Sequence, residues 1–248
     1  MPCALSLLPE GPNYRAEAFR RGLRAAGFKV CDGNWRPSPG DALLIWNRYP
    51  RHDEQIRRFE KAGASVLVIE NGYFGKEWIG RKWFAISRGH HNGAGSWPEG
   101  GPERWDGWGV ELAGWREGGE TILLPQRGFG EPGVRMPEDW LQRAQAAHPY
   151  ARTRSHPGPG VHPQDEFERD LARAGRAVTW ASGAGLKALL LGIPVECWFP
   201  RWIGAPAASA PGEPARRGDR LAMFRRLAWA MWTADEVESG EAFRCISS

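Results

Sequence analysis

The sequence has no long apolar segment. No stretch of its 248 residues approaches the roughly 18 consecutive apolar residues of a membrane-spanning helix. The longest apolar run, residues 186–195, is interrupted by Lys187, Gly192 and Pro194. The first residues are apolar but lack the basic segment that begins a secretory signal. We therefore expect a soluble, cytoplasmic protein without a membrane span.

Cysteine is scarce and dispersed. The four cysteines, Cys3, Cys31, Cys197 and Cys245, form no Cys-x-x-Cys pair and no cluster with histidine. Metal-ligand spacing is therefore absent, and a disulfide framework is unusual in a chain of this length, so we expect no metal site. Cys3 and Cys31 lie on two predicted neighbouring strands and could touch. We interpret both as small buried residues in a reducing compartment.

Charge and aromatic content limit the partners only weakly. The net charge of +4 permits contact with nucleic acid but does not require it. Tryptophan is frequent, with 14 residues, and we expect most of them to fill cores. Four lie in a Gly-rich segment, where they either stack on a flipped base or hold the segment against the protein. These are Trp97, Trp105, Trp108 and Trp115.

The first half alternates strand and helix patterns, which favours βαβ units and a Rossmann-like sheet. Strands are predicted at residues 4–8, 28–31, 42–46, 65–69 and 82–87, and helices at 13–26 and 53–62. Residues 89–119 are rich in Gly, Trp and Pro, and we interpret them as a long functional loop. We place the first domain at residues 1–118.

The second half, residues 119–248, restarts this alternation and forms the second predicted domain. Strands are predicted at 121–125, 150–155, 177–180 and 195–198, and helices at 137–147, 164–174, 184–191 and 220–232. Thr233 followed by Glu236 three residues later predicts a capping box.

One turn has the composition of a phosphate site. A buried strand ending near Thr179 runs through Ser182 and Gly183 directly into a helix. Backbone N–H groups at a helix N-terminus favour a phosphate by geometry and dipole. The P-loop lysine and the full Gly-x-Gly-x-x-Gly spacing are both missing, so neither fingerprint applies. The alternative is a tight turn in which Ser182 only caps the helix.

A second turn contains Arg154 and His156, delivered by a predicted strand and followed by Pro157. Proline biases the preceding residue toward an extended backbone, so the imidazole can point over the carboxyl edge of the sheet. A lone loop histidine is more often an ordinary surface residue. The hypothesis that His156 binds a ligand is stronger because both turns follow strands of one domain, where open α/β sheets bind ligands.

Together the two turns resemble a known family. The turn Arg154-Ser155-His156-Pro157 and the segment 182–195, ending Ala-Leu-Leu-Leu-Gly-Ile-Pro-Val, are similar to the C-terminal domain of GT-B glycosyltransferases. The similarity covers residues 120–200 and is strongest to the capsule-polysaccharide and sialyltransferase-like group and to small phage-encoded, DNA-modifying enzymes. It implies two Rossmann-like domains facing across a cleft, with a C-terminal helix crossing back to the first.

The resemblance also implies a donor site. In that group the two turns hold the phosphates of a nucleotide sugar, here a UDP- or CMP-sugar, and no metal or other cofactor is required. One serine followed by glycine replaces the family's Ser-Ser or Ser-Thr pair, which leaves the donor open. The implied donor-binding residues are Gln126, Arg127, Arg154, His156, Ser182 and Gly183.

In a GT-B enzyme the first domain supplies the acceptor site and the base. An inverting transfer needs a carboxylate or histidine within hydrogen-bond reach of the acceptor hydroxyl. Our candidates are Glu70 and His91, because each ends a predicted strand and begins a Gly-containing turn. The alternatives are a cap or ion-pair partner for Glu70 and an exposed loop residue for His91.

These observations predict a glycosyltransferase that moves a sugar to a hydroxyl group. The compact chain, the aromatic loop and the phage-like resemblance favour a 5-hydroxymethylpyrimidine in double-stranded phage DNA as acceptor, and hence the host cytoplasm. A surface polysaccharide or a lipid-linked acceptor is the alternative. A non-catalytic sugar-nucleotide-binding module and an epimerase on the same fold are further alternatives.

Overall fold

The computed structural model describes the whole chain except residues 34, 92, 129, 132, 157–163 and 248. The chain divides into two compact units. Unit 1 comprises Met1–His91, Gly95–Gly101 and Arg226–Ser248, and unit 2 comprises Asn92–Ala94 and Pro102–Arg225. The main division between the units lies at residues 101/102. The sequence analysis placed the domain boundary at residues 118/119. The C-terminal segment returns to unit 1.

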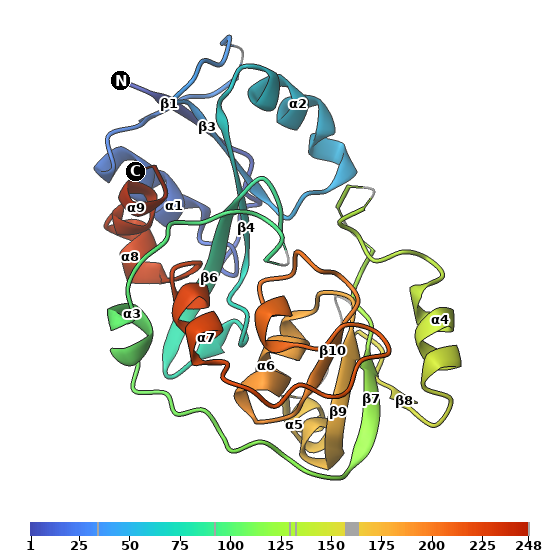
Figure 1. Ribbon diagram of the computed structural model, residues 1–248. Helices are drawn as coiled ribbons and strands as arrows, with labels where there is room; N and C mark the ends of the chain where they lie inside the picture. Colours follow the sequence, from blue (N-terminus) through green and yellow to red (C-terminus); the bar gives the residue numbers. More distant parts are fainter. Residues whose placement is uncertain (34, 92, 129, 132, 157–163, 248) are drawn as a thin grey trace. The chain divides into compact units, whose positions relative to one another are not determined.

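Unit 1 is built on a seven-stranded sheet with the order β11-β6-β4-β3-β1-β2, in which β5 pairs with β6. Helices flank this sheet (Figure 1). Its elements are β1 (Cys3–Ser6), α1 (Ala16–Ala25), β2 (Lys29–Val30), β3 (Ala42–Trp46), the 3-10 turn η1 (Pro50–His52), α2 (Asp53–Lys61), β4 (Ser65–Asn71), β5 (Glu77–Trp78), β6 (Arg81–Arg88), β11 (Met231–Thr233), α8 (Ala234–Glu238) and α9 (Glu241–Ser247).

The sheet of unit 1 is mixed. β2, β1, β3 and β4 are parallel, as the strand–helix alternation predicted, whereas β6 runs antiparallel to both of its neighbours, β4 and β11. The prediction of one helix over 220–232 was wrong, because the helix ends at Ala228 and the chain becomes β11. There the N–H of Ile86 donates to Ala230 O at 2.9 Å, so the last residues pair with the sheet edge instead of extending the helix.

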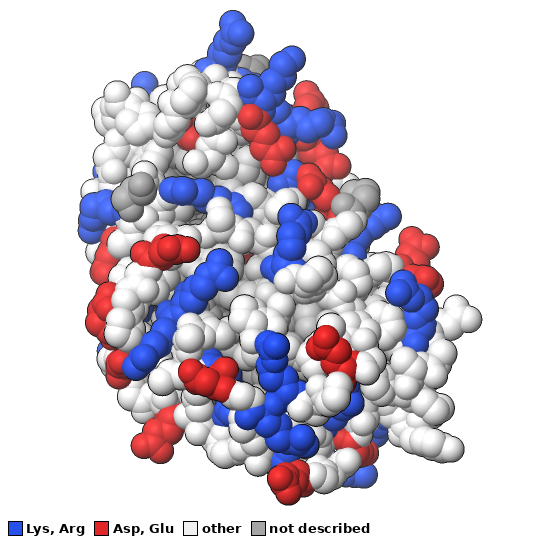
Figure 2. Space-filling view, viewed as in Figure 1, with Lys and Arg blue, Asp and Glu red and all other residues white. Residues whose placement is uncertain are grey.

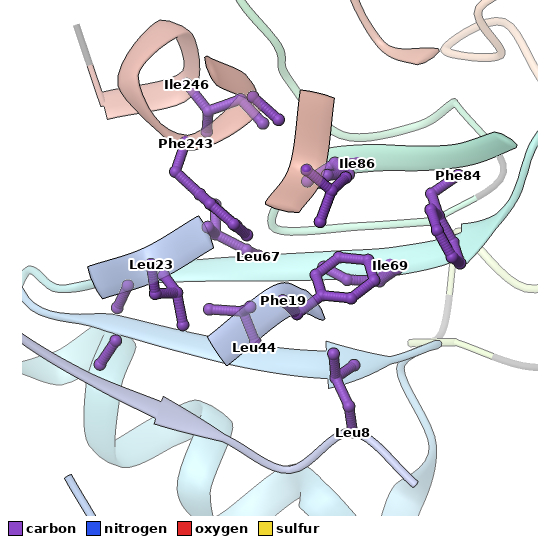
Figure 3. Packing of buried hydrophobic residues seen from close by; sticks show 14 of the residues in the cluster. Leu8, Phe19, Leu23, Leu44, Leu67, Ile69, Phe84, Ile86, Phe243 and Ile246 are labelled. Carbon is purple, nitrogen blue, oxygen red and sulfur yellow. The ribbon is translucent and has the colours of Figure 1, made fainter. Parts of the chain in front are cut away.

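β3 and β4 are buried on both faces, which explains their continuous apolar sequences. Successive side chains alternate between faces, so Leu44 and Leu67 join the layer with α1, α8 and α9, while Leu43 and Val66 join the layer with α2. Figure 3 shows the larger of these two clusters. Its labelled members are Leu8, Phe19, Leu23, Leu44, Leu67, Ile69, Phe84, Ile86, Phe243 and Ile246.

The C-terminal helices pack closely on α1. A Cβ atom added to Gly22 would lie 1.8 Å from the backbone oxygen of Val237 in α8, so only glycine permits this approach. The capping box at the start of α8 is confirmed: Thr233 Oγ1 accepts the N–H of Glu236 at 3.2 Å, and Glu236 Oε2 accepts the N–H of Thr233 at 2.6 Å.

Unit 2 contains a four-stranded, all-parallel sheet with the order β10-β9-β7-β8 (Figure 1). The expected strand 150–155 is shorter than predicted, and a helical turn lies within the expected loop 89–119. The elements of unit 2 are α3 (Glu103–Asp106), β7 (Glu120–Leu124), α4 (Trp140–Ala147), β8 (Arg152–Thr153), α5 (Gln164–Arg173), β9 (Ala174–Thr179), α6 (Gly183–Leu190), β10 (Val195–Cys197), the 3-10 turn η2 (Ala205–Ala207) and α7 (Leu221–Ala228). The last of these helices spans the division between the units.

Candidate functional site

The sheet of unit 2 has a topological switch point between β7 and β9. From β7 the chain passes to β8 on one side, and it then returns to form β9 on the other side. Loops leaving the carboxyl ends of two such strands diverge and open a crevice, where open α/β sheets bind their ligands. The turn after β7 begins with Pro125 and Gln126, and the turn after β9 runs through Ala181 and Ser182.

Two side chains hold these turns together. Gln126 Oε1 accepts the backbone N–H of Ala181 at 2.9 Å. Thr179 Oγ1 donates to Leu124 O at 3.1 Å and accepts the N–H of Ser182 at 3.0 Å. Both side chains are buried. The sequence-predicted residues Gln126 and Ser182 are therefore fixed at one edge of one sheet.

The Gln126 amide also presents a donor. The residue is 8% exposed, and its Nε2 is buried without an acceptor among the described residues. The contact with the Ala181 N–H requires an oxygen, which assigns the nitrogen to the other side of the amide. A buried donor left unpaired costs about 1–3 kcal/mol, so this group needs an explanation such as an absent ligand.

Ser182 caps α6, as its alternative interpretation proposed. Its Oγ accepts the N–H of Ala184 at 3.1 Å, and its carbonyl accepts the N–H of Gly185 at 3.0 Å. Gly183, the first residue of α6, has no recorded acceptor for its N–H within the described part of the chain. A Cβ on Gly185 would lie 3.1 Å from Thr179 Cγ2, so glycine brings the start of α6 close to β9. The cap leaves the helix N-terminus at the switch point.

Arg154 follows β8, the strand beside β7. Its N–H donates to Leu123 O at 3.0 Å, its Nε donates to Asp170 Oδ2 at 2.8 Å, and its guanidinium lies 4.7 Å from the centroid of the Phe167 ring. The side chain is 14% exposed and is thus anchored on α5. His156 is exposed, and the predicted Pro157 lies outside the described residues.

Arg127 follows Gln126 and is half-buried. Its position after β7 is that expected for a residue lining the donor site. The convergence of Arg127 and His156 with Ser182 stays a prediction.

The two candidate bases lie in unit 1 in different settings. Glu70 is half-buried within β4, opposite Ala85, so the strand extends past the residue at which we expected it to end. His91 is buried, and its Nδ1 accepts the N–H of Arg48 at 3.4 Å. An Nδ1 that accepts places the proton of the neutral ring on Nε2. Arg48 in turn donates to Gly89 O at 2.5 Å.

The sequence analysis did not identify the unusual backbone conformation of Asn47. Its φ of 56° lies in the left-handed region directly after β3, beside the switch point between β1 and β3 of unit 1. Its N–H donates to Ile69 O at 2.9 Å, and its Nδ2 donates to Tyr49 OH at 3.3 Å. Non-glycine residues adopt this backbone conformation at a cost, and asparagine adopts it more readily than most. No sequence signal beyond the residue type indicated it.

The described residues contain no group of three or more His, Cys, Asp and Glu side chains arranged to hold a metal ion. Within the same residues, no helix combines the length and apolar character needed to cross a membrane. Figure 2 shows basic side chains interspersed with acidic ones on the face viewed.

No family model and no curated protein matches the chain. Two solved structures from Thermosulfurimonas dismutans are similar to it. KpsC described as a beta Kdo 2,7 transferase is 14% identical, with a TM-score of 0.55, over 98% of this chain and 99% of that chain. KpsC described as a beta Kdo 2,4 transferase is 16% identical, with a TM-score of 0.56, over 93% of this chain and 90% of that chain. The chain shares the α/β fold of these two transferase structures.

Proposed function

We propose that the chain is a glycosyltransferase that holds the phosphate of a nucleotide sugar at the carboxyl edge of the unit 2 sheet. The observation that carries the proposal is the buried Gln126 Nε2, which lacks an acceptor among the described residues at the topological switch point. A phosphate oxygen would accept its hydrogen. The fold shared with two Kdo transferases supports sugar transfer as the reaction.

The proposed site suits the departure of a phosphate. When the bond between the sugar and the phosphate oxygen breaks, negative charge develops on that oxygen. The N-terminus of α6, at Gly183, carries partial positive charge, and the buried Gln126 Nε2 offers a hydrogen-bond donor at the same edge of the sheet. Arg127 and His156 are the proposed neighbouring phosphate-binding residues. Such preorganised donors stabilise the transition state more than the ground state.

The proton of the acceptor hydroxyl requires a base, and we propose Glu70 or His91 of unit 1 for this role. In an inverting transfer the hydroxyl oxygen attacks the anomeric carbon, its proton passes to the base, and the bond to the phosphate breaks. The Glu70 carboxylate is half-buried at the carboxyl end of β4. His91 has the proton of its neutral ring on Nε2, so it acts as a base only in the other tautomer or through a change in the Arg48 contact.

The first donor to test is a CMP-sugar carrying Kdo, because the similar structures are Kdo transferases. UDP-sugars form the second group. A capsule-type or lipid-linked sugar is the leading acceptor for the same reason. Hydroxymethylated DNA remains the prediction from the sequence, although the mixed charges in Figure 2 are typical of an ordinary solvated surface.

The test is incubation with CMP-Kdo and a panel of UDP-sugars against three acceptors: an oligosaccharide ending in Kdo, hydroxymethylated duplex DNA and unmodified duplex DNA. Mass spectrometry of the acceptor is the measurement. Sugar on the oligosaccharide alone supports the proposal, and sugar on hydroxymethylated DNA alone moves the acceptor to DNA. Donor binding without transfer to any acceptor would identify a non-catalytic module and contradict the enzyme assignment.

A variant isolates the donor site. Gln126→Glu keeps an oxygen for the Ala181 N–H but replaces the free N–H by a negatively charged oxygen. We expect donor affinity to fall at least about tenfold, since charge-assisted hydrogen bonds contribute about 1.5–3 kcal/mol. Gln145→Glu on α4 is the matched control, because among the described residues Gln145 donates only to Thr153, at 3.4 Å. Equal donor affinity in both variants would remove Gln126 from the site.

A further inference from the structure

A pair of cysteines lies outside the proposed donor site. Cys3 begins β1, and Cys31 directly follows β2, the strand at one edge of the unit 1 sheet. The two strands are parallel, and Cys31 continues their pairing by donating its N–H to Ala4 O at 2.9 Å. The two sulfur atoms are 3.0 Å apart. The sequence suggestion that these residues could touch is therefore confirmed.

The separation of the two sulfur atoms approaches that of a disulfide. Both cysteines are free thiols, and both are half-buried instead of enclosed in the core. A disulfide bond joins sulfurs about 2.05 Å apart, so bond formation requires an approach of roughly 1 Å. Among the described strands, β2 pairs with β1 alone, so no described strand on its outer side resists that movement.

The other two cysteines differ from this pair. Cys197 is buried, and burial raises the pKa of its thiol to about 12. Its sulfur contacts the backbone oxygens of Trp180 and Phe199 at 3.2 Å and 3.1 Å. Cys245 lies on α9, packed against the main core of unit 1. Among the described hydrogen bonds, only Cys3 and Cys31 bring two sulfurs together.

We propose that Cys3 and Cys31 form a reversible dithiol–disulfide pair that is oxidised by a small-molecule disulfide such as oxidised glutathione. A thiolate of the pair attacks the glutathione disulfide, whose S–S bond breaks and releases one reduced glutathione. The second thiol then attacks the mixed disulfide, forms the Cys3–Cys31 bond and releases the second reduced glutathione. Two electrons and two protons pass from the pair to glutathione, so the exchange is balanced.

The surroundings set the rate of this exchange. The pKa of Cys31 lies above its usual value, chiefly because its thiol contacts that of Cys3, with burial adding to the effect. The charge of Lys29 opposes this increase in the pKa, whereas Asp41, whose Oδ1 accepts the N–H of Cys3 at 2.7 Å, adds to it. Because the thiolate is the attacking species, we expect oxidation to accelerate as the pH rises toward the pKa of the pair.

The disulfide would close a loop that contains α1. This helix contributes Phe19 and Leu23 to the main core of unit 1. A cross-link across β1, α1 and β2 restricts the unfolded chain more than the folded one. We therefore expect the oxidised protein to melt roughly 5–10 °C above the reduced protein.

The experiment places the full chain in glutathione buffers of increasing oxidised fraction, followed by alkylation of remaining thiols and peptide mass spectrometry. We expect one intramolecular bond between Cys3 and Cys31, while Cys197 and Cys245 are alkylated after unfolding. Thermal unfolding should show the increase in Tm in the wild type and in Cys245→Ser, and its loss in Cys31→Ser.

Two results would overturn the proposal. One is stable attachment of glutathione to Cys3 or Cys31 without an intramolecular bond. The other is an oxidation-dependent increase in Tm that persists in Cys31→Ser. If that variant does not fold, the peptide map and melting curves of the wild-type chain decide the question, because both compare one sequence in two redox states. None of these measurements depends on the proposed transferase activity.

Discussion

The side-chain oxygen of Gln126 accepts the backbone N–H of Ala181 at 2.9 Å, and this bond joins the turn after β7 to the turn after β9. Its partner lies 55 residues away, so the bond fixes the spacing of two strand ends that are distant in sequence. The same amide presents its buried Nε2 at the switch point. One side chain therefore both organises the edge of the sheet and offers the donor on which the proposed function rests.

Thr179→Val should weaken this edge of the sheet. Valine has the shape of threonine but cannot pair with Leu124 O or the Ser182 N–H, which Thr179 contacts at 3.1 Å and 3.0 Å. Leaving buried groups unpaired costs about 1–3 kcal/mol, and we expect a loss of that size in urea unfolding. Thr153→Val in β8 is the control, and an equal loss there would contradict the assigned role of Thr179.

Gly22→Ala should destabilise unit 1. The added Cβ would meet the backbone oxygen of Val237 at 1.8 Å, and backbone moves less readily than a flexible side chain. Overpacking of this kind costs about 1–3 kcal/mol, which exceeds the benefit of alanine in a helix. Chemical unfolding of Gly114→Ala provides the comparison, since no atom of the described residues lies within 4 Å of a Cβ at that position. A Gly22 variant as stable as the wild type would show that α1 and α8 can separate.

Glu196→Gln should destabilise unit 2. The Glu196 carboxylate is 0% exposed and lies 2.6 Å from Arg176, 3.1 Å from His148 and 2.7 Å from Trp198 Nε1. Glutamine cannot compensate the charge of Arg176. Its amide nitrogen would also replace an oxygen that accepts hydrogen bonds in the wild type. Breaking a buried pair costs about 3–5 kcal/mol, and the partial exposure of Arg176 reduces the expected loss to about 2–4 kcal/mol. The solvent-exposed Glu168→Gln should change the unfolding free energy by less than about 1 kcal/mol.

Asp41 should make stability decline in acid. Burial raises the pKa of this carboxyl, but hydrogen bonds donated by Cys3, Ser38 and Trp35 outweigh burial and hold the pKa below its usual value of 3.8. The unfolded chain therefore binds the proton more tightly. The stabilising contribution of the Asp41 carboxylate is complete above about pH 5 and is lost as the pH falls through the pKa of Asp41 in the folded protein.

Melting temperature against pH is the corresponding measurement for Asp41. Asp41→Asn should lower the Tm at neutral pH and flatten its decline below about pH 5, because the titrating group is gone. The exposed Asp139→Asn should retain the acid dependence of the wild type. Parallel curves for the wild type and Asp41→Asn would contradict the assignment of this dependence to Asp41.

The sequence predicted those parts of the fold that depend on local pattern. β3 and β4 were predicted because strands buried on both faces have continuous apolar sequences, and β7 and β9 because short apolar runs alternate with helical patterns. β11 was missed because Met231–Thr233 follows a helical pattern directly, and its partner β6 lies far earlier in the chain. The antiparallel direction of β6 depends equally on pairing that no local pattern contains.

The candidate site likewise has features that follow from local sequence pattern and features that depend on long-range contacts. The Ser182 cap follows from a strand, a small polar residue and a helix in succession, and the structure contains it. The link between Gln126 and Ala181 depends on strand order, so the sequence indicated Gln126 only through the family resemblance. The anchoring of Arg154 by Asp170 joins a strand end to a helix 16 residues later, which spacing alone does not predict.

Unit 1 is assembled from three separate segments, whereas nearly all of unit 2 is the continuous segment Pro102–Arg225. A ribosome therefore releases every strand of unit 2 before it has made β11, α8 and α9. Until those residues emerge, Phe19 and Leu23 on α1 lack the layer that covers them in the native protein. The α1 face of the unit 1 sheet therefore stays incompletely covered while unit 2 is synthesised, and apolar surface exposed during this interval favours aggregation.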